Sequence, residues 1–340
     1  MNPVLEEMDK RGHDIAEVSL IHDDIRKRKP GFEDVDISNG DIFICSYPRI
    51  MQTLRDKKNG RIRFDHGCKK TVCIEHGVNP IAWGFPLDRH RLFDHVFVTG
   101  KWQMDAVRRS LFNYDLLPKC KMTGWPKADF LVGKGTQEVR RKYRQRLRDF
   151  VKQDFKSGPI ISWVPTHGGA CDMTDEILDR IGNEYNVVVA PHEGSYAAFR
   201  DGRMKMNYKE DYPYYIETDT IYDVLLASDL VITDYSSAGV EATLLNIPII
   251  QILKDMKFHN RSEFDVLKNG HYPLSQNDDR EFRLGANVSD LSILKNEVSD
   301  ALIEQSDYHR KEREFWRDEI FHNAGNATKD VCDFLENSVL

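Results

Sequence analysis

The chain has 340 residues, of which 40% are hydrophobic and 30% charged, and its formal net charge is −7 at pH 7. This length predicts two domains, and this composition is that of a globular protein with ample core, which excludes a disordered chain. The net negative charge argues against a surface that binds nucleic acid unspecifically, so we expect no nucleic-acid partner.

Seven short apolar runs predict buried strands. Their continuous apolarity, without alternation, is what a parallel sheet covered on both faces requires. Helical patterns such as 101–112 and 238–246 lie between them, so the chain is expected to form α/β layers with right-handed crossovers. The predicted strands are 41–47, 70–77, 95–100, 158–166, 186–194, 229–237 and 247–252.

A long polar helix is predicted at 137–158, between two groups of strands. We place the domain boundary at its end, which gives an N-terminal domain over 1–156 and a second domain over 157–300. The charge run of this helix indicates a solvated face rather than a contact with an anionic surface. The tail is predicted to form two helices with a break near 323–328. The helices within 301–340 could pack back on the N-terminal domain.

Polar residues follow the carboxyl ends of several predicted strands, where doubly wound α/β domains bind their ligands. Three of these strands end in histidine, at His76, His167 and His192. A lone histidine at a strand end is more often a hydrogen-bonded structural residue, but three of them mark a candidate site. The candidates at strand ends are His76, Gly77, Thr166, His167, Gly168, His192, Asp234, Ser236 and Ser237.

The run DLVITDYSSAGVEATLLNIPIIQI (229–252) contains two serines where a strand gives way to a helix. Ser236 and Ser237 stand at the cap position, so their hydroxyls can accept hydrogen bonds from backbone amides. The amino end of a helix is also an anion site, and the small Ala238 and Gly239 let a phosphate approach the backbone. From these residues alone, capping and phosphate binding stay equally open.

Several features bear on where the protein acts. No apolar run approaches the roughly 18 residues of a membrane-spanning helix, and the first residues are acidic and amphipathic, unlike a signal peptide. Six scattered cysteines without a CxxC pair predict reduced thiols rather than a disulfide or zinc framework. We expect a cytoplasmic protein, and the basic stretch from Arg140 to Lys156 leaves peripheral membrane contact at the inner face open.

Three segments, VITDYSSAGVEATLLNIPII (231–250), TVCIEHGVNPIAWGF (71–85) and CKMTGWPKADFL (120–131), carry a resemblance. They are similar to the signature, the His-Gly segment and the Gly-x-Pro-Arg-x-Asp turn of the CDP-glycerol glycerophosphotransferase family, with Lys127 in place of the arginine. This family comprises the teichoic-acid and capsule polyol-phosphate transferases of bacteria. The likeness covers about residues 70–255, and it implies a GT-B-like fold of two Rossmann-like doubly wound domains with a cleft between them.

The resemblance implies an activity. A polyol phosphate, with glycerol phosphate as the first expectation, would pass from a CDP-polyol donor to a hydroxyl of a glycan or polyol-phosphate acceptor, releasing CMP. The acceptor could be lipid-linked. Phosphoryl transfer needs positioning, charge stabilisation and a base for the attacking hydroxyl, and an imidazole titrates near neutrality. We therefore expect His76 to be the general base.

The remaining candidates receive roles from the same resemblance. We expect His192 and the helix start at Ser236 and Ser237 to hold the donor pyrophosphate, and Glu241 to accept the ribose hydroxyls. The other assignments are Thr166, His167 and Gly168 to the phosphate or base region, Asp234 to anchoring the donor loop, and Gly77 and Lys127 to the acceptor or phosphate side.

No cluster of residues has the spacing of metal ligands, so we expect no dedicated metal site and no tightly bound cofactor, while Mg²⁺ carried by the donor pyrophosphate stays open. Two other functional hypotheses remain. A GT-B glycosyltransferase or a UDP-sugar 2-epimerase would use a nucleotide sugar on the same architecture, which fold alone does not separate. A non-catalytic nucleotide-binding subunit is the second alternative.

Overall fold

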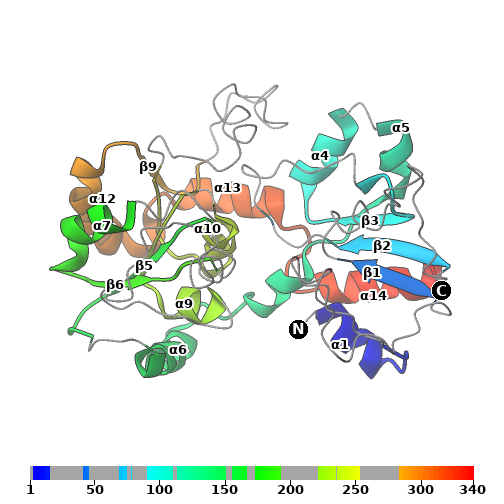
Figure 1. Ribbon diagram of the computed structural model, residues 1–340, viewed down its shortest axis with the longest axis horizontal. Coiled ribbons are helices and arrows are strands. Elements are labelled where there is room, and N and C mark those ends of the chain that lie inside the picture. The colour runs from blue at the N-terminus through cyan, green and yellow to red at the C-terminus, as the bar shows by residue number, and fades with distance from the viewer. Residues whose placement is uncertain are drawn as a thin grey trace, which may run out of the picture. The chain divides into compact units, whose positions relative to one another are not determined.

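The chain forms two compact units (Figure 1). The first comprises Met1–His76, Pro86–Asp129 and Phe321–Leu340, and the second comprises Gly77–Phe85 and Phe130–Ile320. Both are α/β units with a parallel sheet. The computed structural model describes residues 3–15, 41–45, 69–74, 78, 90–109, 113–150, 155–166, 173–192, 221–234, 236–252 and 283–340.

The first unit is built on a parallel sheet in the order β1-β2-β3-β4. Its two inner strands are buried at all but their first residues, as expected of a sheet covered on both faces. The strands are β1 (Ile42–Cys45), β2 (Lys70–Ile74), β3 (His95–Val98) and β4 (Cys120–Met122). The helices are α1 (Pro3–Lys10), α4 (Lys101–Arg109), α5 (Asn113–Leu116) and α14 (Ala327–Ser338), and 3₁₀ turns span Leu117–Lys119 and Pro126–Phe130.

Helices α1 and α14, from opposite ends of the chain, pack side by side against β2 and β3 (Figure 1). Arg11, just after α1, forms ion pairs with Asp333 at 2.9 Å and Glu336 at 2.8 Å on α14. The carboxyl-terminal helix therefore completes the core of the first unit. The shared cluster consists of Val4, Met8, Val72, Ile74, Phe97, Val331, Cys332 and Leu335.

The second unit contains a parallel sheet in the order β6-β5-β7-β8-β9. Because β6 and β7 flank β5 on opposite sides, the chain changes its winding direction at β5. Strands β5 to β8 are buried at every position. The strands are β5 (Ile160–Val164), β6 (Asn186–Val189), β7 (Leu230–Thr233), β8 (Ile249–Ile252) and β9 (Ala286–Val288).

The helices α7 and α12 share one hydrophobic cluster with this sheet, in which Ile177 and Val298 lie with Trp163. The helices of the second unit are α6 (Gln137–Phe150), α7 (Thr174–Ile177), α9 (Ile221–Ala227), α10 (Ser237–Ala242), α12 (Leu294–Glu304) and α13 (Arg310–Ile320). Short helical turns span Leu178–Gly182, Thr243–Leu245, Leu291–Ile293 and Gln305–Asp307.

All seven predicted strands are present, which confirms that part of the prediction. The sequence did not reveal β4 and β9, because each has three residues and neither forms a continuous apolar run. The tail contains three helices where two were expected. The additional break separates α12 from α13, where Gln305 and His309 adopt positive φ values of 52° and 47° that an α-helix does not accommodate.

Helix α6 belongs to the second unit, so the division falls before this helix and not at residue 156. Two of its arginines attach it to the end of α9. Arg140 Nη1 donates to the backbone oxygen of Ser228 at 2.9 Å, and Arg144 Nε donates to that of Ala227 at 3.0 Å. Cations are favoured there because backbone carbonyls at a helix end carry partial negative charge. Contacts between segments more than 80 residues apart therefore decide where α6 belongs.

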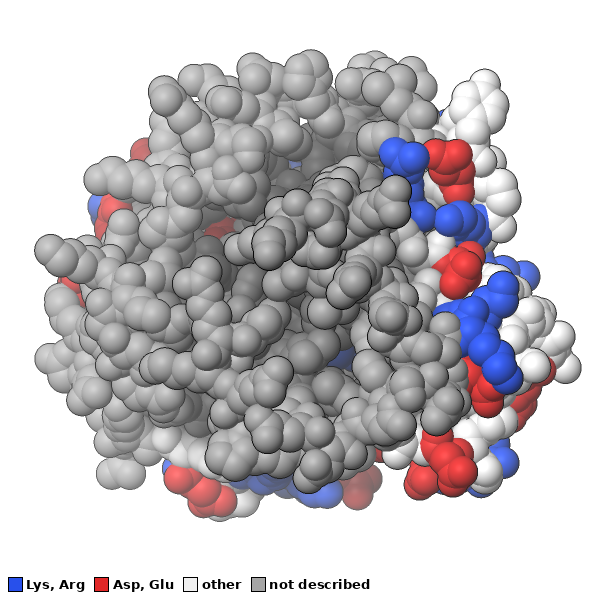
Figure 2. All heavy atoms as spheres, turned by 45° about the vertical axis from the view of Figure 1, so that its right-hand side comes forward, with Lys and Arg blue, Asp and Glu red and all other residues white. Residues whose placement is uncertain are grey.

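The described residues also show the distribution of surface charge, the character of the helices and the state of the cysteines. Figure 2 shows basic and acidic side chains interspersed on the described part of one face. None of the helices that the structure describes combines the length and the apolar character needed to cross a membrane. Four cysteines are described, and all are free thiols: Cys45, Cys73, Cys120 and Cys332.

Candidate functional site

The candidate site of the second unit lies where β5 and β7 end. Numbered by their sequence order within this sheet, the strands lie as 2-1-3-4-5, an order whose ligands bind beyond the carboxyl ends of the first and third strands. Here those two strands are β5 and β7. Thr166 closely follows β5, and Asp234 and Ser236 follow β7, so the topology brings these three predicted residues to one edge.

Asp234 joins the two strand ends. Its side chain is fully buried, its Oδ1 accepts from Thr166 Oγ1 at 2.8 Å, and both of its oxygens lie 3.0 Å from Thr166 N. Oδ1 also accepts from Ser236 N at 3.0 Å. Burial raises the pKa of Asp234 to about 6, although these hydrogen bonds act in the opposite direction. The carboxyl group thus holds the turn after β5 against the start of α10, as an anchoring role requires.

Ser236 is the N-cap of α10. Its backbone is extended, with φ −66° and ψ 143°, and its Oγ accepts a hydrogen bond from Ala238 N at 3.3 Å. Ser237 is the half-buried first residue of the helix, and its hydroxyl has no hydrogen-bond partner among the described residues. The two serines therefore differ: Ser236 makes the capping bond, whereas the hydroxyl of Ser237 is available to another group.

Gly239 allows α10 to approach β7 closely. A Cβ atom at this position would lie 2.6 Å from Cγ2 of Thr233, well inside van der Waals contact. Thr233 is itself fixed, because its Oγ1 donates to the backbone oxygen of Val164 at 3.0 Å. The sequence suggested that Gly239 admits a phosphate to the backbone, and the structure gives it a packing role between helix and strand.

Glu241 is buried in α10 and is hydrogen-bonded by Tyr222 of α9. The Tyr222 ring stacks on Phe130, with centroids 5.4 Å apart and planes at 19°. Burial, together with the charge of Glu241, raises the pKa of Tyr222, so its hydroxyl remains protonated and donates. Sequence reasoning missed Tyr222, because nothing near it in the chain marks it and its partner follows 19 residues later.

The other predicted residues lie apart from the hydrogen bonds of Asp234 or outside the described residues. His192 follows β6 and is exposed. Lys127 belongs to the first unit, and its Nζ lies 5.9 Å from the centroid of the Trp125 ring. The contact of Lys127 with a phosphate stays a prediction. Within the described ranges, no group of three or more His, Cys, Asp or Glu side chains is placed to hold a metal ion. His76, Gly77, His167 and Gly168 lie outside the described residues.

The Gly-x-Pro turn of the first unit has a clear structural role. Asp129 accepts hydrogen bonds from Gly325 N at 2.7 Å, Ala327 N at 3.2 Å and Thr328 N at 2.7 Å. These amides belong to the start of α14, whose positive dipole end a carboxylate stabilises. The turn therefore connects β4 to the carboxyl-terminal helix.

Comparison with known proteins identifies the relatives of this chain. The family model described as CDP-Glycerol:Poly(glycerophosphate) glycerophosphotransferase matches residues 86–337, well over half of the chain. The teichoic acid glycerol-phosphate primase of Bacillus subtilis (strain 168) is 28% identical over 87 residues. This match covers 26% of the chain and only 22% of the length of that relative.

Solved structures of the wall teichoic acid polymerase TagF are similar in fold. A variant with one histidine replaced by alanine aligns with a TM-score of 0.60 and 14% identity, covering 88% of this chain and 73% of that one. A second TagF structure aligns with a TM-score of 0.54 and 16% identity, covering 84% and 71%. At such identities the likeness shows the fold, and it confirms the predicted GT-B-like α/β architecture. The family model, which matches well over half of the sequence, shows that this chain belongs to the CDP-glycerol:poly(glycerophosphate) glycerophosphotransferase family.

Proposed function

We propose that this protein is an enzyme that transfers glycerol phosphate from CDP-glycerol to a hydroxyl group of a teichoic-acid or capsule-type acceptor and releases CMP. The observation that carries the proposal is the position of the family-like run 231–250 in the fold. It supplies Asp234 and Ser236 at the switch point of a doubly wound sheet, where such sheets bind nucleotides. The names of the relatives agree, since one is a glycerol-phosphate primase and one TagF structure was soaked with CDPG.

The reaction needs one displacement at phosphorus. The acceptor hydroxyl oxygen attacks the phosphorus of the glycerol phosphate group, and the bond from that phosphorus to the oxygen bridging to CMP breaks. The hydroxyl proton passes to His76 as general base, and CMP leaves with the bridging oxygen. Positioning and charge stabilisation contribute most to such a transfer. We assign stabilisation of the leaving CMP to His192, with hydrogen bonds from the start of α10.

The donor would lie along the edge formed by β5, β7 and α10. We assign Ser237 to its phosphates and Thr166 to the lining of the phosphate or base region, since Asp234 fixes the turn carrying Thr166 and the start of α10 at that edge. Glu241 would accept the ribose hydroxyls, with Tyr222 as a positioning residue that orients its carboxylate. Four further residues keep their proposed roles, namely His167 and Gly168 on the donor side, and Gly77 and Lys127 on the acceptor or phosphate side.

A CMP-release assay tests the proposal. The purified protein, incubated with CDP-glycerol and a glycerol-phosphate acceptor, is expected to release CMP, with and without a chelator that shows whether Mg²⁺ on the pyrophosphate contributes. In thermal shift, a donor at 100 times its dissociation constant stabilises the folded state by about 2.7 kcal/mol. Stabilisation by a UDP-sugar in place of CDP-glycerol would favour a glycosyltransferase or epimerase. Donor binding without CMP release would favour a non-catalytic subunit.

The two serines of α10 are expected to respond differently. Ser236→Ala removes the bond to Ala238 N and is expected to lower the free energy of unfolding by about 1 kcal/mol. Ser237→Ala removes a hydroxyl that has no partner among the described residues, so we expect unchanged stability and about tenfold weaker binding of CDP-glycerol, the size of one hydrogen bond to a charged group. Urea unfolding and calorimetric titration measure the two effects. Unchanged donor affinity in Ser237→Ala would remove this serine from the donor site.

The proposal also covers the nature of the acceptor and the place in the cell where the enzyme works. We propose that the enzyme works in the cytoplasm and that its acceptor is lipid-linked, so that it meets its substrate at the inner face of the membrane. Sedimentation of the protein with vesicles that carry a lipid-linked glycerol-phosphate acceptor, compared with plain vesicles of the same lipids, measures this. Equal sedimentation with both would argue for a soluble acceptor.

A further inference from the structure

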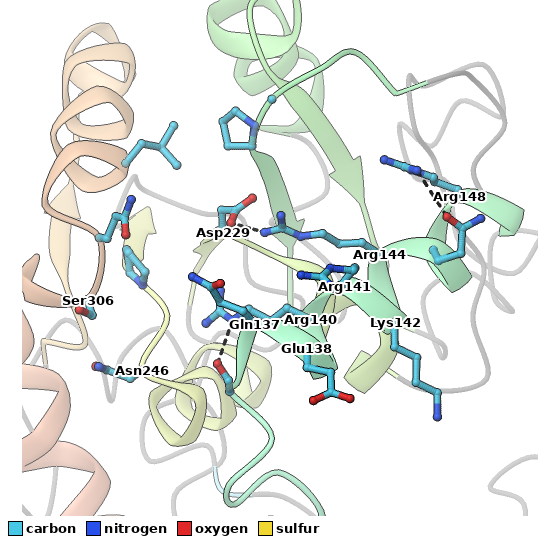
Figure 3. Close-up of a pocket in the computed structure, with 17 residues that line it drawn as sticks. Gln137, Glu138, Arg140, Arg141, Lys142, Arg144, Arg148, Asp229, Asn246 and Ser306 are labelled. Carbon is cyan, nitrogen blue, oxygen red and sulfur yellow. Dashed lines mark hydrogen bonds and ion pairs between the residues drawn. The ribbon is translucent and has the colours of Figure 1, made fainter.

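The second unit has a pocket at the opposite edge of its sheet from the candidate site (Figure 3). Gly158, Pro159, Asp229 and Pro248, which precede β5, β7 and β8, form part of its wall, so it lies at the amino ends of these strands. Helix α6 with Gly135 before it, Asn246, and the end of α12 with the turn that follows it form the remainder. The cavity volume is about 1200 Å³, above the roughly 300–1,000 Å³ of ordinary small-molecule sites. This pocket therefore has room for a ligand larger than a single phosphate.

The lining of this pocket is basic in a protein whose net charge is −7. Its lining contains two acidic and five basic residues, and all five basic residues belong to α6. The acidic residues are Glu138 and Asp229, and the basic residues are Arg140, Arg141, Lys142, Arg144 and Arg148. An excess of positive charge in a concave surface concentrates anions there.

The four arginines of this lining divide into two groups. Arg140 and Arg144 are engaged in the fold, because they hold the end of α9, and Figure 3 shows Arg144 pointing to Asp229, with which it forms an ion pair. Arg141 and Arg148 are exposed, and neither forms an ion pair with a carboxylate among the described residues; Arg148 contacts only the amide oxygen of Gln145, at 3.4 Å. Within the part of the chain that the structure describes, no ion pair ties these two guanidinium groups to the fold.

The spacing of the two exposed arginines suits a chain of phosphates. Residues seven apart lie on one stripe of a helix, and Arg141 and Arg148 are therefore separated by roughly 10 Å along the axis of α6. A phosphodiester chain offers a separate phosphate to each of these side chains, whereas one isolated phosphate contacts both only when both side chains bend toward it. Arginine binds phosphate oxygens with two parallel hydrogen bonds.

We infer that this pocket binds an anionic phosphodiester chain, namely the poly(glycerol phosphate) that acts as acceptor or product, away from the site of transfer. The inference rests on the proposed function for the identity of the polymer. A concave wall favours a flexible chain over a flat lipid surface as the occupant. A second point of attachment raises the effective concentration of a long acceptor at the enzyme. The pocket thus gives the enzyme a preference for longer chains.

Direct binding tests the inference without the transfer reaction. Fluorescence anisotropy of a labelled poly(glycerol phosphate) oligomer, titrated with the full-length protein in the absence of donor, gives the dissociation constant. We expect Arg141→Gln with Arg148→Gln to weaken binding about tenfold, and added salt to weaken binding to the unaltered protein as screening predicts. The matched control is Lys10→Gln with Lys311→Gln, two exposed lysines on α1 and α13, which changes the net charge equally and is expected to leave affinity within about twofold.

The outcomes separate the possible ligands. Equal oligomer affinity in the double variant and the unaltered protein would overturn the inference. The inference would also be overturned if the double variant lost binding to phosphatidylglycerol vesicles but kept its affinity for the oligomer. It would be overturned as well if inorganic phosphate displaced the labelled oligomer as strongly, per molecule, as unlabelled oligomer does. If the oligomer binds through the two arginines but no CMP is released from CDP-glycerol, the pocket is supported while the proposed activity fails.

Discussion

The variant His76→Ala is expected to lower kcat for CMP release by about 10²- to 10⁴-fold, the usual contribution of a positioned general base. His76 follows β2 by two residues in the sequence, and the carboxyl end of a parallel strand is where α/β units hold catalytic groups. Because a base acts chiefly in the transition state, affinity for CDP-glycerol should stay within about tenfold. Single-turnover release of CMP and calorimetric titration with donor separate the two quantities.

A control and a pH profile sharpen this test. His309→Ala alters a histidine on the connection between α12 and α13 of the second unit, outside the strand ends, and is expected to keep full turnover. In the unaltered enzyme kcat should rise with pH as the imidazole of the base loses its proton, and this acid limb should disappear in His76→Ala. Undiminished turnover in His76→Ala would remove this residue from the mechanism.

Gly124→Ala is expected to destabilise the first unit by about 3 kcal/mol or more, because two costs add at this position. Gly124 has φ +91°, a left-handed conformation that costs a residue with a side chain roughly 1 kcal/mol or more. An added Cβ would also lie 2.1 Å from the backbone oxygen of His322 and 2.9 Å from Cβ of Ala327. The segment cannot move away freely, because His322 N donates to Thr99 O at 2.8 Å.

Gly133→Ala is the matched control for this substitution. Gly133 also has a positive φ, of 74°, but nothing lies within 4 Å of the place its Cβ would take. It therefore carries the conformational cost alone, about 1 kcal/mol. Urea unfolding followed by circular dichroism gives both free energies. Equal losses in the two variants would show that the turn relaxes around the new methyl group and that the contact with His322 does not restrain it.

The sequence by itself determined the features that depend on neighbours in the chain. Continuous apolar runs predicted seven strands, and alternation with helices predicted the α/β class, because periodicity and burial are local properties. It also predicted that Asp234 and Ser236 come directly after a buried strand. The family signature was readable for the same reason, since its residues form one continuous segment that runs from β7 through α10 to the start of β8.

Only the tertiary structure decided which distant residues meet. It joined Asp234 to Thr166 across 68 residues and assigned α6 to the second unit through arginines that hold α9. It also gave Glu241 its partner Tyr222. The reason is physical. The contact between Asp234 and Thr166 arises because parallel strands bring their carboxyl ends to one edge, and the other contacts arise because polar groups in the packed interior need partners. The pattern of residues along the chain does not say which partner the packing supplies.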